Sequence, residues 1–169
     1  KIINLYFIGR LTFQKNIMEL LSEFNKLYMN DDKIFLKIIG DGDLYKKAHN
    51  KYSKVKNISF KGYLNNPWEI LEEDAIVIVP SFWEEPGHVP IEAFMNNKRF
   101  LISNGCSLSE FIEKDVFNKV VFDLNELKYT LKNIRTIANP KDWYYNFDKI
   151  YENLENFSFK SFAKSLNEL

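Results

Sequence analysis

Two basic side chains and two carboxylates are the residues of this sequence best suited to bind a charged ligand. Gly9, Arg10 and Lys15 lie in the segment GRLTFQKN, after the first apolar run. Glu84 and Glu92 lie in SFWEEPGHVPIEAF, after the fourth. Two cations close to a helix N-terminus suit a diphosphate, because side-chain charge and free backbone N–H groups converge on one anion. Taken alone, the two cations are equally compatible with ordinary solvated charges.

The turn between the two glutamates has the composition of a phosphate site. Gly87, His88 and Val89 are followed by a proline, which fits the first turn of a helix because a missing N–H costs little there. Their amides would therefore point outward at a helix N-terminus. Glu84 and Glu92 could accept hydrogen bonds from vicinal hydroxyls of a sugar or ribose. Complementing the helix dipole also explains Glu92, but it does not explain Glu84, Gly87 and Glu92 together.

Two further loops carry weaker signals. After the second apolar run, IIGDGD places Gly40 and Gly42 around Asp41, and glycines permit a tight turn and a close approach by a ligand. The segment lacks the third glycine of the dinucleotide fingerprint, and the sequence has no Walker lysine motif. A turn that needs positive φ explains it as well. After the third run, KGYLNN places Tyr63 and Leu64 beside exposed backbone that could hold a flat base.

Alternating strands and helices must position these loops. The predicted strands cover residues 2–9, 34–40, 57–62, 75–80, 99–104 and 119–123. The predicted helices cover 16–30, 43–54, 67–74, 89–97, 107–114 and 124–137, with two more near 141–155 and 158–168. This alternation predicts a doubly wound α/β domain with a parallel sheet covered on both faces. Such sheets bind ligands beyond the carboxyl ends of their strands, where the residues above lie.

Composition narrows the function further. The 169 residues predict one domain, and the 23 basic and 23 acidic residues give no basic excess for nucleic acid. Cys106 is the only cysteine, so neither an internal disulfide nor a Cys/His metal spacing is present. No apolar run reaches the ~18 residues of a spanning helix. The single cysteine fits a reducing compartment such as the cytoplasm, and we expect a piece of a longer protein.

Taken in order, the segments GRLTFQKN, IIGDGD, NISFKGYL and DAIVIVPSFWEEPGHVPIEA resemble the donor-binding half of GT-B glycosyltransferases. The resemblance is to glycosyltransferase family four, whose hallmark is two glutamates separated by seven residues, as Glu84 and Glu92 are. It runs from about residue 5 to 140 and implies a Rossmann-like sheet of about six strands. It also implies a nucleotide-sugar domain over 1–153, and a C-terminal helix over 154–169 that packs toward an N-terminal domain.

The resemblance also implies roles for the site residues. Arg10 and Lys15 neutralise the diphosphate and, with Glu84 at the donor sugar, form the catalytic set. Glu92 holds the ribose hydroxyls. The backbone near Tyr63 and Leu64 takes the base, and the amides of Gly87, His88 and Val89 hold the phosphates. Gly9 and Asp41 complete the expected donor-binding residues. The sequence departs from the family's pattern at Asn16, Glu85, Pro86 and His88.

The function implied is transfer of a sugar from a nucleotide-diphosphate donor, with retention at the anomeric carbon and without a metal or other cofactor. A UDP-sugar is the expected donor and GDP-mannose its rival. The acceptor is a glycan or lipid-linked glycan held by an N-terminal domain, so the isolated domain should be inactive. The full-length enzyme is then expected to associate peripherally with the inner face of the membrane. Two alternatives stay open: a non-catalytic nucleotide-sugar binding module of the same lineage, and an unrelated doubly wound protein.

Overall fold

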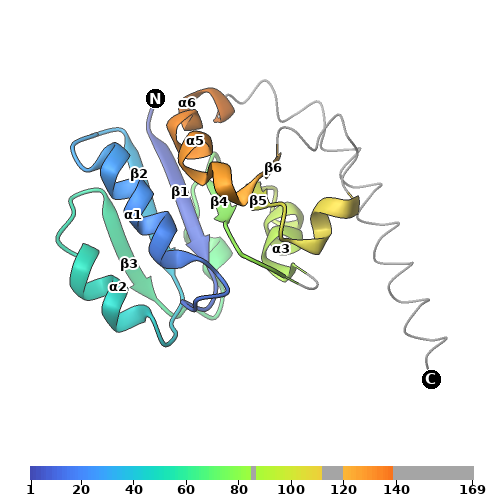
Figure 1. The fold of residues 1–169 in the computed structure, drawn as a ribbon, viewed down its shortest axis with the longest axis horizontal. Helices are drawn as coiled ribbons and strands as arrows, with labels where there is room; N and C mark the ends of the chain where they lie inside the picture. The colour runs from blue at the N-terminus through green and yellow to red at the C-terminus, as the bar shows by residue number, and fades with distance from the viewer. Residues whose placement is uncertain (85–86, 112–119, 139–169) are drawn as a thin grey trace.

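Six parallel strands form one sheet in the computed structural model, which describes residues 1–84, 87–111 and 120–138 (Figure 1). Their order is β3-β2-β1-β4-β5-β6. Their bounds are β1 Ile3–Ile8, β2 Ile34–Ile39, β3 Ile58–Gly62, β4 Ile76–Val79, β5 Arg99–Ser103 and β6 Val121–Phe122. Strand order reverses between β1 and β4, which pair in parallel. This reversal is the switch point at which doubly wound sheets bind ligands.

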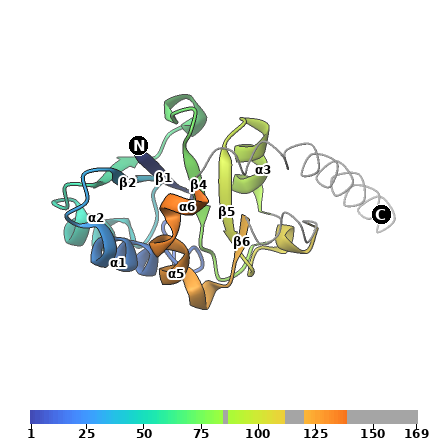
Figure 2. The same cartoon turned by 90° about the horizontal axis from the view of Figure 1, so that it is seen from above.

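Helices cover both faces of the sheet. Figure 2 shows α1, α2 and α5 on one face and α3 on the other. The α-helices in the described part of the chain are α1 Ile17–Tyr28, α2 Tyr45–Tyr52, α3 His88–Met95, α5 Leu127–Lys132 and α6 Ile134–Ile137. Three 3-10 turns, η1 Pro67–Ile70, η2 Ser107–Phe111 and η3 Leu124–Glu126, complete the connections.

The core follows from the apolar runs. Every residue of the central strands β4 and β5 is buried, because helices cover both of their faces. α1 buries one stripe against the sheet, made of Ile17, Leu20, Leu21, Phe24 and Tyr28. Fully burying one such aliphatic or aromatic side chain contributes roughly 1.5–3 kcal/mol. The edge that carries the loops therefore rests on a well-packed sheet.

The predicted doubly wound fold and all six predicted strands are confirmed. The helix predicted over 67–74 is wrong, because the chain makes only the short turn η1 and Leu71 is already extended, with φ −81° and ψ 130°. The helix predicted over 107–114 is the 3-10 turn η2 as far as residue 111. The helix predicted over 124–137 is divided into η3, α5 and α6, the last two separated at Asn133. The predicted helices near 141–155 and 158–168, and the boundary at 154, lie outside the described residues.

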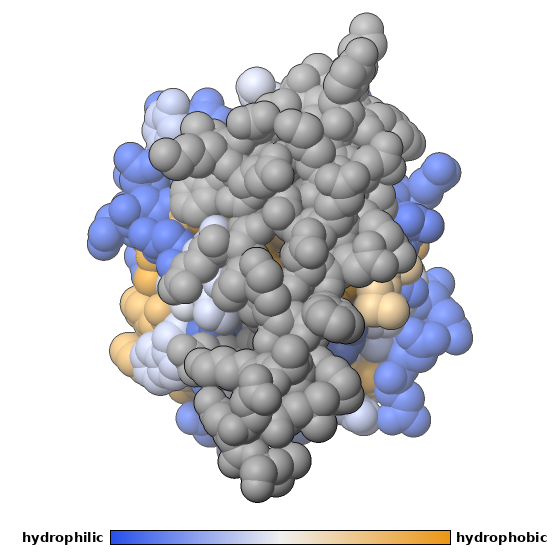
Figure 3. Space-filling model, turned by 90° about the vertical axis from the view of Figure 1, so that its right-hand side faces the viewer, coloured by the Kyte–Doolittle hydropathy of each residue, from blue (hydrophilic) through white to orange (hydrophobic). Residues whose placement is uncertain are grey.

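The surface seen in Figure 3 is mostly hydrophilic where the described residues reach it, with small apolar patches between the charged ones. Among the described helices, none is both long and apolar enough to cross a membrane.

Candidate functional site

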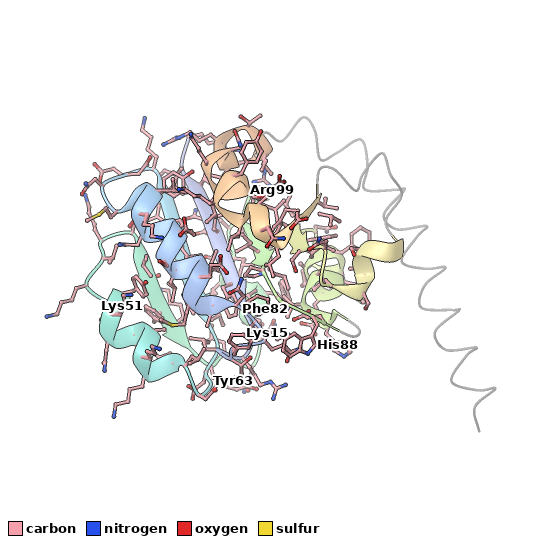
Figure 4. The ribbon with its side chains drawn as sticks, viewed as in Figure 1. Lys15, Lys51, Tyr63, Phe82, His88 and Arg99 are labelled. Atoms are coloured by element: carbon pink, nitrogen blue, oxygen red, sulfur yellow. The ribbon has the colours of Figure 1, made fainter. Side chains whose placement is uncertain are left out.

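The predicted site residues gather at one end of the sheet, where β1, β2, β3 and β4 terminate. Figure 4 shows Lys15, Tyr63, Phe82 and His88 at this end, with Arg99 at the opposite end. Each of the first three follows a different strand. The expected position of these residues, beyond the carboxyl ends of the strands, is therefore confirmed.

A pocket of about 340 Å³ opens at this end between the loops after β1, β2 and β3. Its lining comprises Ile8, Gly9, Arg10, Ile39, Gly40, Asp41, Tyr63, Leu64 and Pro67. Five predicted donor-binding residues, Gly9, Arg10, Asp41, Tyr63 and Leu64, thus lie around one cavity. Tyr63 is 72% exposed, so its ring can pack against a flat ligand.

Backbone hydrogen bonds between the three loops give the pocket its shape. Gly40 N–H donates to Gly62 O at 2.8 Å, and Leu11 N–H donates to Asp41 O at 2.9 Å. Gly40 has φ +132°, and a Cβ at this position would lie 1.9 Å from the carbonyl oxygen of Gly9. Only glycine fits there, because any side chain would force the two loops apart. The wall of the pocket is thus fixed before a ligand arrives.

Lys15 and Glu84 form an ion pair on the other side of the Arg10 loop. Glu84 is only 4% exposed, and its Oε1 also accepts a hydrogen bond from Ser81 Oγ at 3.1 Å. Burial lowers the pKa of the Lys15 ammonium, and the nearby charge of Arg10 lowers it further. Arg10 and Lys15 thus lie on one loop, near enough for their charges to interact.

Hydrogen bonds join the two loops that carry this ion pair. Phe82 N–H donates to Gln14 O at 2.9 Å, and Gln14 Nε2 donates to Trp83 O at 2.8 Å. The Phe13 and Phe82 rings stack with their centroids 4.9 Å apart. Lys15 and Glu84 are thus held by a rigid pair of loops.

Gly87, the residue directly before α3, is buried as well. A Cβ at Gly87 would lie 2.7 Å from Cys106 Sγ and 3.3 Å from Glu84 Oε2. Burial raises the pKa of the Cys106 thiol.

The first turn of α3 has free backbone donors. α3 begins at His88 without a side-chain cap, so its first-turn N–H groups have no partner within the helix. Pro90 is the third helical residue, and its predicted place in the first turn is confirmed.

The remaining predicted residues lie along α3. His88 is exposed and Val89 is half-buried. Glu92 is exposed, and its Oε2 accepts a hydrogen bond from Trp68 Nε1 at 3.2 Å. Trp68 directly follows Pro67, which lines the pocket. Glu92 therefore lies beside the pocket wall, whereas Glu84 is enclosed with Lys15. Glu85 and Pro86 lie outside the described residues.

Comparison with known proteins assigns the chain to a family. Residues 3–150 match the sequence model of the glycosyl transferases group 1 family. This protein belongs to that family. An uncharacterized glycosyltransferase of Methanocaldococcus jannaschii is 32% identical to it over 102 residues, which are 59% of this chain and 25% of the relative.

Two solved structures superimpose on the chain. A mutant of TarM from S. aureus, in complex with Fondaparinux, alpha-GlcNAc-glycerol and UDP, has a TM-score of 0.73 and 23% identity, over 97% of this chain and 34% of TarM. The C-terminal domain of LpcC, a group 1 family protein of Francisella tularensis, has a TM-score of 0.70 and 17% identity, over 91% of this chain and 85% of that domain. The chain thus has the fold of a C-terminal group 1 domain and spans only part of the M. jannaschii relative and of TarM.

Sequence reasoning missed the residues that support the predicted ones. Ser81 bonds to Glu84, Gln14 joins the two loops, and Trp68 bonds to Glu92. The local sequence does predict the turn at Trp68, because Asn66 and Pro67 before it are typical of the start of a helical turn and Asn66 caps η1. The contact of Trp68 with Glu92 has no such local signal. The departure at Asn16 has a physical reason. Asn16 has φ 54°, a left-handed conformation that asparagine tolerates better than most residues other than glycine.

Proposed function

We propose that this domain binds the nucleotide-diphosphate sugar of a retaining, metal-independent glycosyltransferase, with a UDP-sugar as the donor. The observation that carries the proposal is that a preformed pocket lined by Arg10, the Lys15 side chain and the uncapped start of α3 lie at one end of the sheet. A nucleoside requires an apolar slot beside polar groups, and its diphosphate requires converging cations and amides. The edge of the sheet offers both.

In this arrangement the base and ribose occupy the pocket. Tyr63 and Leu64 flank the base, and the polar backbone around Gly9 and Gly40 lies at its rim. Glu92 accepts hydrogen bonds from the ribose hydroxyls in place of the Trp68 indole. The exchange costs little, because Glu92 is exposed and forms one neutral-donor hydrogen bond before the donor binds.

The diphosphate lies between Arg10, Lys15 and the first turn of α3, near Gly87, His88 and Val89. Charge-assisted hydrogen bonds to the two cations contribute roughly 1.5–3 kcal/mol each. They stabilise the departing diphosphate as its charge grows during transfer, which is the work that a metal does in other transferases. No metal ion or other cofactor is then required.

Glu84 has two roles in this proposal: it positions the Lys15 ammonium, and it contacts the donor sugar. Its carboxylate is buried and accepts hydrogen bonds from Lys15 and Ser81, so it holds the ammonium in one place. The same carboxylate lies beside Gly87, the residue before α3. Lys15 therefore enters the reaction in a fixed orientation, which lowers the cost of ordering it when the donor binds. Contact of Glu84 with the donor sugar requires an oxygen to turn outward past Gly87.

The acceptor, a glycan or a lipid-linked glycan, is held by a second domain, and this chain alone binds the donor without turning it over. TarM, which shares the fold, has been crystallised with UDP and sugar ligands. The burial of Glu84 also favours one rival, a non-catalytic nucleotide-sugar binding module in which only the cations and the pocket remain in use.

A thermal-shift titration tests the proposal. The chain is titrated with UDP, UDP-glucose, UDP-N-acetylglucosamine, GDP and GDP-mannose, and the titration is repeated on Arg10→Ala/Lys15→Ala. A ligand at a hundredfold its Kd should add about 2.7 kcal/mol of stability. UDP and its sugars should raise the midpoint of the parent chain and leave that of the double variant unchanged. The control Lys128→Ala, on the exposed side of α5, should respond as the parent does. A response to GDP alone would assign GDP-mannose, and no response to any nucleotide would refute the proposal.

A further inference from the structure

The region around α2 is strongly basic in a chain whose formal net charge is zero. Residues 44–68 contain six lysines and no aspartate or glutamate. All 23 acidic residues and the other 17 basic residues lie outside this segment. The segment is therefore positively charged although the whole chain is neutral, and the proposed donor site uses none of its lysines.

Four of these lysines lie on one surface. Lys46, Lys47 and Lys51 are exposed along α2, and Lys54 is exposed just after the helix ends. Steps of one, five and eight residues from Lys46 fall within one outward arc of a helix, because successive residues are 100° apart. The opposite side of α2 is buried through Ala48 and Tyr52. We call these four residues the lysine face.

The lysine face is not neutralised within the described part of the chain. No ion pair involves its four lysines there, whereas Lys56 pairs with Asp32 at 2.6 Å. The Lys51 ammonium lies 5.2 Å from the centre of the Tyr52 ring, a contact that leaves its charge uncompensated. Asp43, two residues before α2, is the acidic residue nearest in sequence. Figure 4 shows Lys51 at the margin of the domain, on the α2 side.

We propose that the lysine face binds an anionic membrane surface. Ammonium groups on flexible stems act as point charges and suit a fluid layer of lipid phosphates, whereas bidentate phosphate recognition favours arginine. The face has no arginine, and the one other exposed residue on α2 is Asn50. The rings of Tyr45 and His49 on the same helix are half-buried and stack on each other, so neither presents a free face for stacking on bases. These features favour lipid over nucleic acid.

The position of α2 gives this contact a consequence. The helix begins at the rim of the pocket, where Tyr45 N–H donates to Gly42 O at 3.0 Å and Leu44 N–H donates to Leu11 O at 2.9 Å. A domain resting on the lysine face therefore brings the mouth of the pocket close to the lipid surface. The inference goes beyond the donor site and does not depend on which donor binds.

Vesicle sedimentation tests the inference. The chain is mixed with vesicles of phosphatidylglycerol and phosphatidylcholine, and with vesicles of phosphatidylcholine alone. We expect binding only to the anionic vesicles, and loss of that binding at about 1 M salt, where the Debye length falls to about 3 Å. Each lysine near an anionic surface raises the binding constant for the vesicles roughly fivefold. The variant Lys46→Gln/Lys47→Gln/Lys51→Gln/Lys54→Gln should therefore bind anionic vesicles at least about a hundredfold more weakly than the parent chain.

A matched variant controls for net charge. Lys26→Gln/Lys33→Gln/Lys128→Gln/Lys132→Gln removes four exposed lysines that lie on or near α1 and α5, and it should bind anionic vesicles far better than the first variant. Circular dichroism and the UDP thermal shift should be unchanged in both, which separates this inference from the donor site. Equal weakening by both variants, or no binding to anionic vesicles by the parent chain, would overturn it. Tight binding to single-stranded RNA with no vesicle binding would also overturn it and assign the face to nucleic acid.

Discussion

Arg10, Asp41 and Tyr63 on the pocket side of the ligand edge are exposed, whereas Ser81, Glu84 and Gly87 on the turn side are buried. Backbone hydrogen bonds fix the pocket side, so its side chains remain available to a ligand. Side-chain contacts fix the turn side, so it forms part of the core. Changes on the turn side should therefore alter stability and binding together, and changes on the pocket side should alter binding alone.

The largest loss of stability is expected from Glu84→Gln. The substitution keeps the shape of the side chain but leaves the half-buried Lys15 ammonium without its counter-charge. Breaking a buried ion pair costs about 3 kcal/mol, and the Tm should fall by about 6–12 °C for a chain of this length. Glu92→Gln is the matched control and should leave the Tm unchanged, because Glu92 is exposed. Equal Tm values for the two variants in calorimetry would show that the ion pair on the turn side does not stabilise the domain.

Gly87→Ala should cost about 1–3 kcal/mol of unfolding free energy. The new methyl group would lie 2.7 Å from Cys106 Sγ, so the turn or the thiol must move. Chemical denaturation of the single variant and of Gly87→Ala/Cys106→Ala measures the effect. The double variant should recover part of the loss, because removing the sulfur makes room. A loss of the same size without recovery would place its cause elsewhere than in this contact.

The stability of the domain should fall as the pH rises above about 10. Burial first, and then the hydrogen bond to Glu72 at 2.8 Å, raise the pKa of Tyr6 above its ordinary value. The folded domain therefore keeps a proton that the unfolded chain releases, and stability drops by up to about 1.4 kcal/mol per pH unit. Tyr6→Phe should flatten this slope in denaturant titrations. Because Tyr6 lies in the core, the donor site should not alter the slope, and a flattening by Tyr63→Phe instead would contradict the assignment.

The smallest effect on folding is expected from Arg10→Ala. Its side chain is exposed, so the free energy of unfolding should change by no more than about 0.5 kcal/mol. Affinity for UDP should nevertheless fall roughly ten- to hundredfold, because one charge-assisted contact is lost. Calorimetric titration measures the affinity for UDP, and a denaturation curve measures the free energy of unfolding of the same variant. A large loss of stability with unchanged affinity would reverse the comparison between the two sides.

The sequence predicts the strands and the ligand-binding edge of this domain well, and it predicts the side-chain contacts within the site poorly. Apolar runs of strand length, separated by amphipathic helices, indicated the sheet, and the topology of such sheets indicated the edge where Arg10 and Tyr63 lie. The ion pair of Lys15 with Glu84 joins residues 69 positions apart, and no local pattern encodes it. The region 67–74 has helical composition, but an extended Leu71 ends its first turn.

Calorimetric titration of the chain with UDP and with uridine tests the central claim, that one edge binds a nucleoside in the pocket and its diphosphate at the cations. We predict that UDP binds at least tenfold more tightly than uridine, and that Arg10→Ala/Lys15→Ala reduces UDP to the affinity of uridine. Equal affinities for UDP and uridine in the parent chain, or the absence of binding heat for UDP, would contradict the account.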